Sequence, residues 1–355
     1  MLKTLKIDNL RGISSGVIED LAQVNVLVGP NNAGKSTILD ALLFVASPNP
    51  TTALGPVLTR RHLNNPSLWL LHRNKGKRSS NGTLSVTSDK DDTRQVILSA
   101  SYQDTVASIA VHVWPEEKEI TALQKKMGTR PTDPAALQQW VAQQQGWQQK
   151  LNDLQQKYNL KQQQGEIIPG TPEVHLIEPD LSKRQTSLAD LYTLVAERGL
   201  RKQAKEIVTD LIPEVEDIEI LTQNSQPVVY LDLLERGALP VELAGEGVQL
   251  LLVLSFELAR PSGGLVLLEE PETHLHPAAI RQAARAVRAA ADREIQAVIT
   301  THSLDLIDSL LEVFNDSLDL LAFYRVKLDN GELISYRLSG EKAAKARTEI
   351  SEDLR

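Results

Sequence analysis

The chain has 355 residues and no cysteine, and its 46 acidic and 38 basic side chains give a formal net charge of −8 at pH 7. This composition excludes disulfide bonds, thiolate metal sites and a cysteine nucleophile, and it argues against a uniformly basic surface for nucleic acid. The first ten residues mix charged and apolar side chains, unlike a signal peptide, and no apolar run is long enough to span a bilayer. We therefore expect a soluble, cytoplasmic protein with no membrane partner.

A phosphate-binding loop lies near the N-terminus. Residues 2–7, 16–20 and 24–28 have strand patterns, and the last of these is mostly apolar, as in a buried strand. Residues 29–37 then read Gly-Pro-Asn-Asn-Ala-Gly-Lys-Ser-Thr, which matches G-x-x-x-x-G-K-[ST] in full, and a helix pattern follows. Glycines let backbone N–H groups turn toward an anion, and the helix start adds a partial positive charge. The sequence thus predicts a cradle for the phosphates of ATP.

Two residues of this loop have predicted roles of their own. Lys35 is expected to reach the β and γ phosphates and to assist catalysis, and the Ser36 hydroxyl is expected to ligate Mg²⁺. ATP and Mg²⁺ are thus the expected cofactors, and the predicted ATP-binding residues of the loop are Gly29, Asn31, Asn32, Ala33, Gly34, Lys35, Ser36 and Thr37.

The remainder of residues 1–114 predicts an antiparallel β subsheet within the N-terminal part of an ATPase domain. Pro48, Pro50 and Gly55 are expected to break the helix after the loop, and a polar, basic surface stretch follows. Three β-like runs come next, separated by turn residues, at residues 83–87, 95–102 and 106–114.

Residues 115–165 are rich in glutamine and carry a helix pattern with one break, which predicts an inserted helical hairpin. Apolar residues of its second helix fall on the a and d positions of one heptad frame. Two interpretations stay open: an arm for a partner or for self-association, and a helical pair packed back on its own domain. Trp140 and Trp147 are expected to pack rather than to stack on bases.

Residues 166–355 form the predicted C-terminal part of the ATPase domain. An apolar strand pattern at residues 264–268 runs into Glu269 and Glu270. Such a strand end fits a Walker B segment, in which the first carboxylate holds Mg²⁺ and the second positions and deprotonates the attacking water. Glu269 is therefore the predicted metal ligand, and Glu270 is the predicted catalytic base.

Another apolar strand pattern, at residues 297–300, leads into His302. A neutral imidazole there can hydrogen-bond a γ-phosphate oxygen or the attacking water, so His302 is a further predicted catalytic residue. After it we expect a helix, a hairpin through Asp329-Asn330-Gly331 and a charged tail. Earlier in this part, two helices split at Gly199 and two strands, at residues 217–221 and 228–233, are expected.

A second glycine-rich turn, Glu-Leu-Ala-Gly-Glu-Gly-Val-Gln, opens a helix at residues 242–249. It is another anion cradle, and it is hard to place on the same phosphate as the first. The simplest geometry sends it to the nucleotide of a second subunit.

Together these segments resemble the ABC-type ATPases of the overcoming-lysogenization-defect (OLD) family, which are related to RecF and SMC ATPases. The resemblance rests on residues 9–12, the phosphate loop, and residues 244–247, 267–277 and 300–303. It implies an α/β P-loop NTPase fold of ABC-ATPase type, with the antiparallel β subsheet and the inserted helical hairpin. It also implies that two head domains sandwich ATP, so that Gly245 and Gly247 act in trans, and that Arg11 lies near the nucleotide base.

Two departures from the family pattern bear on activity. Ala244 replaces the usual signature serine, and losing that donor costs about 1–3 kcal/mol, which is expected to slow hydrolysis without abolishing ATP binding. Many OLD-family proteins continue into a Toprim nuclease domain, whereas roughly fifty residues follow His302 here, with no metal-nuclease pattern among them.

We therefore expect an ATPase that dimerises around ATP, as a homodimer or a higher even-numbered oligomer. It would regulate a separately encoded nuclease or effector protein, in anti-phage defence or DNA repair. The alternative is a slowly hydrolysing, ATP-bound scaffold or sensor. A transporter ATPase subunit is disfavoured by the altered signature.

Three weaker signals have structural explanations beside functional ones. His274 and His276 could ligate a metal, but relatives use this segment at the dimer interface. Arg281, Arg285 and Arg288 recur on one helix face and could follow DNA phosphates, yet such rows are usually solvated. The basic stretch at residues 60–78 is open to the same two interpretations, so DNA contact stays possible.

Overall fold

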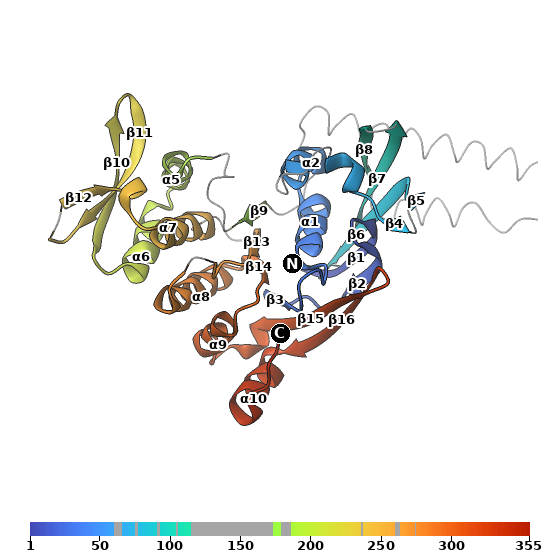
Figure 1. Ribbon diagram of the computed structural model, residues 1–355. Helices are drawn as coiled ribbons and strands as arrows, with labels where there is room; N and C mark the ends of the chain where they lie inside the picture. The colour runs from blue at the N-terminus through green and yellow to red at the C-terminus, as the bar shows by residue number, and fades with distance from the viewer. Residues whose placement is uncertain are drawn as a thin grey trace, which may run out of the picture. The chain divides into compact units, whose positions relative to one another are not determined.

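The computed structural model describes residues 1–59, 66–74, 77–90, 93–103, 106–114, 173–178, 186–235, 237–259, 263–273 and 275–355 (Figure 1). These residues belong to two compact units. Unit 1 comprises Met1–Asp20, Asp40–Pro172 and Leu328–Ile334, and unit 2 comprises Leu21–Leu39, Glu173–Lys327 and Ser335–Arg355. The predicted hairpin at residues 115–165 lies outside the described residues.

Unit 1 contains the predicted antiparallel subsheet. Its strand order is β8-β7-β6-β1-β2, and the first residues of β16 run parallel beside β2. The three β-like runs of the sequence are confirmed as β6, β7 and β8, which pair with one another in antiparallel register. Alternating residues of β6 and of the middle of β7 are buried, among them Leu84, Val96 and Leu98. The bounds are β1 Leu2–Leu10, β2 Ile13–Ile18, β6 Asn81–Ser88, β7 Thr93–Gln103, β8 Val106–Trp114 and β16 Glu332–Ser339.

The helix break expected after the phosphate loop is only partly correct. α1 (Lys35–Ala46) does end before Pro48, but a second helix, α2 (Pro50–Thr59), forms across Pro50 and Gly55. Pro50 is its first residue, where a missing N–H costs nothing, and the Asn49 side chain accepts a hydrogen bond from the N–H of Thr51. A short 3₁₀ turn, η1 (Pro66–Trp69), and the small strands β4 (Arg73–Asn74) and β5 (Lys77–Arg78) follow.

Unit 2 is built on a parallel sheet with the strand order β15-β3-β14-β13-β9. Three of its strands, β3, β14 and β13, are apolar and almost wholly buried, as expected for strands covered on both faces. Buried Asn25 in β3 is satisfied by hydrogen bonds to Ala22 and to the carbonyl of Ala297. The bounds are β3 Val24–Val28, β9 Val174–Ile177, β13 Leu265–Glu269, β14 Gln296–Thr300 and β15 Leu321–Asp329.

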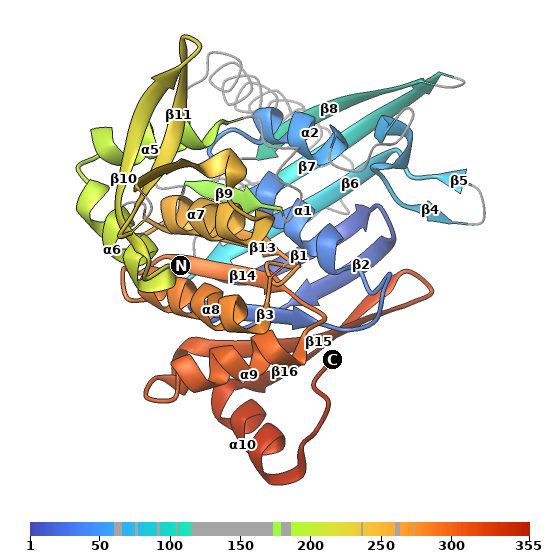
Figure 2. The same ribbon diagram turned by 60° about the vertical axis from the view of Figure 1, so that its left-hand side comes forward.

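Three consecutive helices lie over one face of this sheet: α7 (Glu246–Leu258), α8 (Pro277–Ala291) and α9 (Leu304–Val313) (Figure 2). Each presents apolar residues to the sheet, and together they form one hydrophobic core with strands β3, β13 and β14. None of the helices in the described part of the chain has the length and apolar character needed to cross a bilayer.

A second, three-stranded antiparallel sheet in unit 2 has the order β10-β11-β12. The two expected strands are confirmed as β10 (Val215–Gln223) and β11 (Gln226–Leu233), whereas β12 (Gly237–Pro240) was not expected from the sequence. The two helices split at Gly199 are confirmed as α5 (Leu188–Glu197) and α6 (Arg201–Leu211), and they share a core with α7 and this sheet.

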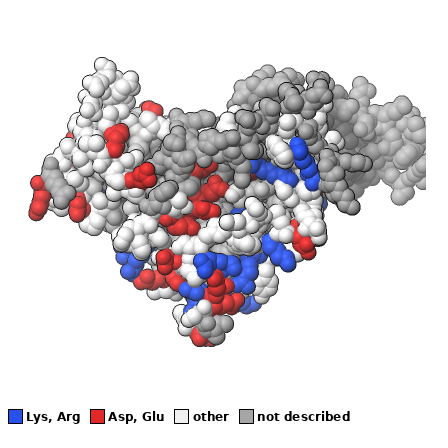
Figure 3. Space-filling view, in the orientation of Figure 1, with Lys and Arg blue, Asp and Glu red and all other residues white. Residues whose placement is uncertain are grey.

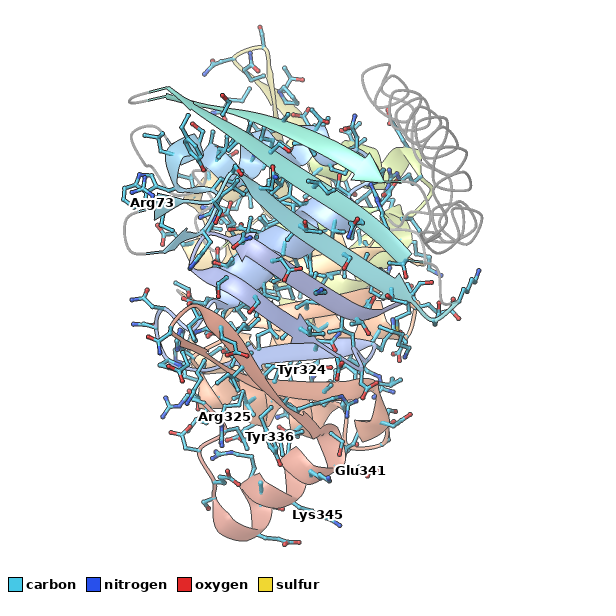
Figure 4. The ribbon with its side chains drawn as sticks, turned by 90° about the vertical axis from the view of Figure 1, so that its right-hand side faces the viewer. Arg73, Tyr324, Arg325, Tyr336, Glu341 and Lys345 are labelled. Atoms are coloured by element: carbon cyan, nitrogen blue, oxygen red, sulfur yellow. The ribbon has the colours of Figure 1, made fainter. Side chains whose placement is uncertain are left out.

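The C-terminal part contains the expected hairpin. Asn330 and Gly331, at φ 49° and 90°, connect β15 to β16, as a tight turn with two left-handed residues requires. The expected charged tail is in fact a helix, α10 (Gly340–Ile350), which carries Glu341 and Lys345 one turn apart (Figure 4). Ser339 caps it by accepting a hydrogen bond from the N–H of Lys342. The high charge of this segment had led us to expect a charged tail in place of a helix.

Candidate nucleotide site

The parallel register of unit 2 brings the three predicted motifs to one edge of the sheet. Glu269 of β13 lies opposite Thr300 of β14, and Thr300 lies opposite Leu27 of β3. The phosphate loop, the acidic pair and the His302 loop therefore leave their strands at the same level. Ligands of open α/β sheets bind at this carboxyl edge.

The phosphate loop has the backbone of an anion cradle. Asn32 and Gly34 are left-handed, at φ 64° and 91°, and the helical bond from Ile38 N–H to the Gly34 carbonyl starts α1 directly behind them. Gly29 sits at φ 145°, and a Cβ there would lie 2.2 Å from the carbonyl oxygen of Val326. This position therefore admits only glycine, and the helix start supplies the partial positive charge that phosphate needs.

Lys35 is only 6% exposed, at the start of α1. Its ammonium donates to the carbonyl oxygens of Gly29 and Pro30, at 2.8 and 3.1 Å. Burial lowers the pKa of Lys35, and the negative charges of Glu270 and Glu272 act against this shift. The loop thus encloses the charged amino group of Lys35. Its present partners are carbonyl oxygens, which the oxygens of a phosphate can replace.

Glu270 is held in a sparsely populated conformation directly after β13. Its φ is 43°, and its backbone N–H donates to both the carbonyl and the hydroxyl oxygen of Thr300, at 3.0 and 3.2 Å. Non-glycine residues in this region cost about 1–3 kcal/mol and are concentrated at functional sites. The neighbouring strand therefore fixes the direction in which this carboxylate leaves the sheet.

The side chains of Glu270 and His302 meet. His302 Nε2 lies 3.5 Å from Glu270 Oε1, and the two side chains are 36% and 41% exposed. A pair that is in contact and still reachable from solvent is the arrangement that a general base and a phosphate-sensing imidazole require. The structure thus brings Glu270 and His302 into contact, and the charge of Glu270 acts on Lys35; the catalytic roles of the three residues stay predictions. Glu269, the last residue of β13, stays the predicted metal ligand.

Glu272 and Thr301 also belong to this site, although the sequence assigned them no role. Glu272 Oε1 accepts hydrogen bonds from the Thr301 hydroxyl, at 2.5 Å, and from the His302 N–H, at 3.1 Å. Burial raises the pKa of Glu272, which the hydrogen bonds from Thr301 and His302 partly counteract. In the sequence, the one feature that could have pointed to Glu272 is its place two residues after the predicted Walker B pair.

The second glycine-rich turn forms the exposed start of α7. Gly245 is the N-cap residue, and a Cβ there would meet no heavy atom within 4 Å. Beside it Leu243 is 72% exposed, and the Ala244 carbonyl accepts a hydrogen bond from the Gln249 side chain at 3.0 Å. Gly245 is exposed at the start of α7, and the action of Gly245 and Gly247 in trans stays a prediction.

Arg11 already has protein partners within unit 1. Its Nε lies 3.0 Å from Oδ2 of the fully buried Asp40, and its Nη2 donates to the Val57 carbonyl at 2.8 Å. The ion pair with Asp40 and the hydrogen bond to Val57 hold the guanidinium against α1 and α2, and its contact with a nucleotide base stays a prediction.

The arginine row on α8 is largely paired with α9 rather than free for DNA. Arg281 bonds Glu312, and Arg288 bonds Asp316 and the Val313 carbonyl at the C-terminus of α9. In the C-terminal part of unit 2, basic and acidic side chains lie next to one another on the surface (Figure 3). These contacts favour the interpretation of the row as a solvated, ion-paired helix face.

The other weak signals are only partly covered by the described residues. His274 lies outside them, and His276 is the N-cap of α8, with Nδ1 accepting from the Ala278 N–H at 3.3 Å. Residues 60–65 and 75–76 of the basic stretch are likewise outside them. In the described part of this stretch, the Arg73 guanidinium stacks 3.9 Å from the centre of the Trp69 ring. Trp140 and Trp147 also lie outside the described residues.

The described residues have the fold of a phosphate-loop ATPase of the SMC-head type, with the phosphate loop and the acidic strand end at one edge of the sheet. The N-terminal part, residues 1–168, matches a family described as "AAA ATPase domain". Residues 152–308 match a family described as "AAA domain, putative AbiEii toxin, Type IV TA system".

Solved SMC heads share the fold over nearly the whole chain. An SMC head bound to the C-winged helix domain of ScpA is 15% identical, with a TM-score of 0.59 over 96% of this chain and 99% of that one. An SMC head with an extended coiled coil, bound to the C-terminal domain of ScpA derived from Pyrococcus furiosus, is 13% identical, with a TM-score of 0.55 over 99% and 100%. At such identities the likeness establishes the fold alone.

Similar curated sequences match over shorter stretches. The DNA double-strand break repair Rad50 ATPase of Methanopyrus kandleri is 50% identical over 48 residues, which are 14% of this chain and 6% of that protein. The protein MJECL11 of Methanocaldococcus jannaschii is 28% identical over 113 residues, 31% of this chain and 98% of that protein. MJECL10 of the same organism is 47% identical over 47 residues, 13% of this chain and 22% of that protein. This chain therefore matches only a small part of the first and last of these relatives.

Proposed function

We propose that this protein binds ATP and hydrolyses it to ADP and phosphate. The observation that carries the proposal is the contact between Glu270 and His302 at the sheet edge that also bears Lys35. Glu270 accepts the proton of the attacking water, Lys35 offsets the charge of the β and γ phosphates, and His302 donates a hydrogen bond to a γ-phosphate oxygen or to that water.

The donor set also fits Mg²⁺. The Ser36 hydroxyl stands in the first turn of α1, and the Glu269 carboxylate stands at the end of β13. Both are hard oxygen ligands, and Mg²⁺ typically takes one or two protein oxygens with phosphate oxygens and water completing the shell. Ser36 and Glu269 would therefore hold the ion, which supplies charge neutralisation to the phosphates.

The proposed assembly is a homodimer, or a higher even-numbered oligomer, of the ABC/OLD type with ATP between two heads. The exposed N-cap of α7 at Gly245 supports this, because a helix start can offer its partial positive charge to a phosphate held by another subunit. In this proposal the nucleotide state controls a separately encoded nuclease or effector in the cytoplasm, in anti-phage defence or DNA repair. The names of the Rad50 relative and of the AbiEii-type family agree with that setting.

Steady-state hydrolysis by the wild type and by Glu270→Gln tests the enzymatic proposal. The substitution keeps shape and removes the base, so we expect turnover to fall about 10²–10⁴-fold while ATP binding persists. Glu219→Gln, an exposed acid on β10, is the matched control and should turn over like the wild type. Wild-type turnover no faster than that of Glu270→Gln would refute the proposal.

The second candidate, an ATP-bound scaffold or sensor, rests on Ala244. No side chain caps α7 at Gly245, and alanine supplies no hydroxyl beside it. If the missing hydroxyl at Ala244 is what slows hydrolysis, Ala244→Ser should speed turnover about tenfold, which is the value of one charge-assisted hydrogen bond.

Mixing Lys35→Ala with Gly245→Asp subunits tests action in trans. Heterodimers keep one intact composite site and should regain activity that neither variant has alone.

A further inference from the structure

The turn after β13 holds His302 from two sides. Glu270 Oε1 lies 3.5 Å from the His302 ring at Nε2, while Glu272 Oε1 accepts the His302 backbone N–H at 3.1 Å. Glu270 and Glu272, which are separated only by Pro271, thus contact the ring and the backbone of His302, a residue of the loop between β14 and α9. The Glu272 bond fixes where the backbone of His302 sits, and the Glu270 contact depends on that position.

The Glu272 bond extends into the start of α9. Thr301, which is fully buried, donates its hydroxyl to Glu272 and accepts the Ser303 N–H at 2.9 Å. Ser303 in turn caps α9 by accepting the Leu306 N–H at 3.3 Å. The loop from β14 to α9 is therefore organised around a single carboxylate oxygen. Among the described residues, the second oxygen, Oε2, is buried without a hydrogen-bond partner.

We propose that Glu272 is a positioning residue for His302, which keeps the imidazole at the distance from Glu270 that ATP hydrolysis needs. This inference rests on the proposed function. Glu272 touches neither the water nor the phosphates in this scheme; it acts through the backbone of His302. Removing it should slow the chemical step and leave ATP affinity nearly unchanged, because the phosphate loop provides the binding contacts.

Two pairs of variants separate positioning from general damage. Glu272→Ala removes both bonds, while Glu272→Gln keeps an acceptor oxygen. Thr301→Val is isosteric and removes only the hydroxyl, while Thr301→Ser keeps it. We expect Ala and Val to lower kcat about 10–100-fold with the Kd for ATP within about twofold, and Gln and Ser to restore kcat to within about threefold of the wild type.

A double-mutant cycle with His302→Ala identifies the residue through which Glu272 acts. If it acts through His302, Glu272→Ala should slow His302→Ala by no more than about twofold. Multiplication of the two losses would overturn the proposal. If the alanine variant does not fold, Thr301→Val replaces it in the cycle and tests the hydroxyl that holds Glu272 in place.

Hydrogen exchange of the His302 amide tests the inference even if the protein hydrolyses no ATP. In nucleotide-free protein, this amide should exchange at least about tenfold faster in Glu272→Ala than in the wild type, with Glu219→Gln unchanged. Equal exchange rates would overturn the positioning role. Faster exchange with no wild-type hydrolysis would instead sink the proposed function and keep the contact.

Discussion

Replacing Gly29 by alanine tests whether the phosphate loop is held as tightly as the structure indicates. At φ 145° an L-residue is strained, by about 1–3 kcal/mol. The new Cβ would also lie 2.2 Å from the Val326 carbonyl oxygen and 3.3 Å from its carbon, and these backbone atoms of β15 cannot rotate away. Overpacking of this kind costs about 1–3 kcal/mol more. We therefore expect a total loss of about 2–6 kcal/mol, unless the loop moves and relieves it.

Urea unfolding and ATP binding are both measured on Gly29→Ala, because the loop can either stay in place or move. An undisplaced loop gives the full loss in the free energy of unfolding, and a displaced loop gives a smaller loss but destroys the cradle and weakens ATP binding. Gly55→Ala is the matched control, since Gly55 lies in α2 and a Cβ there meets no heavy atom within 4 Å. It should stabilise the protein by about 0.5–1 kcal/mol, through helix propensity. Unchanged stability together with unchanged ATP affinity in Gly29→Ala would refute the reasoning.

Three further predictions concern stability. Burial raises the folded-state pKa of Glu272. Its contribution to the free energy of unfolding is therefore fully present below the ordinary pKa of a glutamate and is lost as pH rises through the folded-state pKa. In denaturant unfolding from pH 4 to 8, the stability of Glu272→Gln relative to the wild type should increase as pH rises. Arg288→Met removes the bonds to Asp292, to Asp316 and to the Val313 carbonyl of α9, and it should lower the free energy of unfolding by about 1–2 kcal/mol. Arg285→Met, which loses a bond to Gln282 within α8, should change the free energy of unfolding by less than about 0.5 kcal/mol in the same experiment. Burial lowers the pKa of Arg94 to about 10, so Arg94→Met should raise the melting temperature at pH 7. A lower melting temperature would show that the hydrogen bond from Arg94 to the C-terminus of α1 outweighs the cost of desolvation.

The three motifs at the carboxyl edge of the unit 2 sheet could be read from the sequence because their signals are local. A phosphate loop needs its glycines, its lysine and a helix in fixed order, and Glu270 and His302 each follow a short apolar strand. Once the strands are parallel and in register, their ends must meet. The antiparallel subsheet of unit 1 was equally readable, because its strands alternate in polarity between clear turn residues.

The features that the sequence did not reveal depend on contacts between distant segments. Glu272 looked like one more solvated acid, and only its bonds to Thr301 and His302 give it a role. The prolines of α2 argued against a helix, and α10 was recognised only as a charged segment, so neither helix was predicted. The capping side chains of Asn49 and Ser339 mark where these helices begin, which composition does not. Arg11 was placed near the base by resemblance, and its bond to buried Asp40 could not be seen without the fold.

The charges of the site explain why ATP binding and association would be coupled. Lys35 is the cation that the phosphate loop supplies, while Glu269, Glu270 and Glu272 follow one another on the Walker B turn. In nucleotide-free protein, Glu270 and Glu272 support the charge on Lys35, as the opposing influences on its pKa show. A bound triphosphate draws Lys35 to itself and faces these acids, so the site needs further positive charge. In the proposed dimer, Mg²⁺ would supply part of it, and the start of a partner's α7 would offer the partial charge of a helix N-terminus. ATP would therefore favour the dimer because a single head leaves its phosphates under-neutralised.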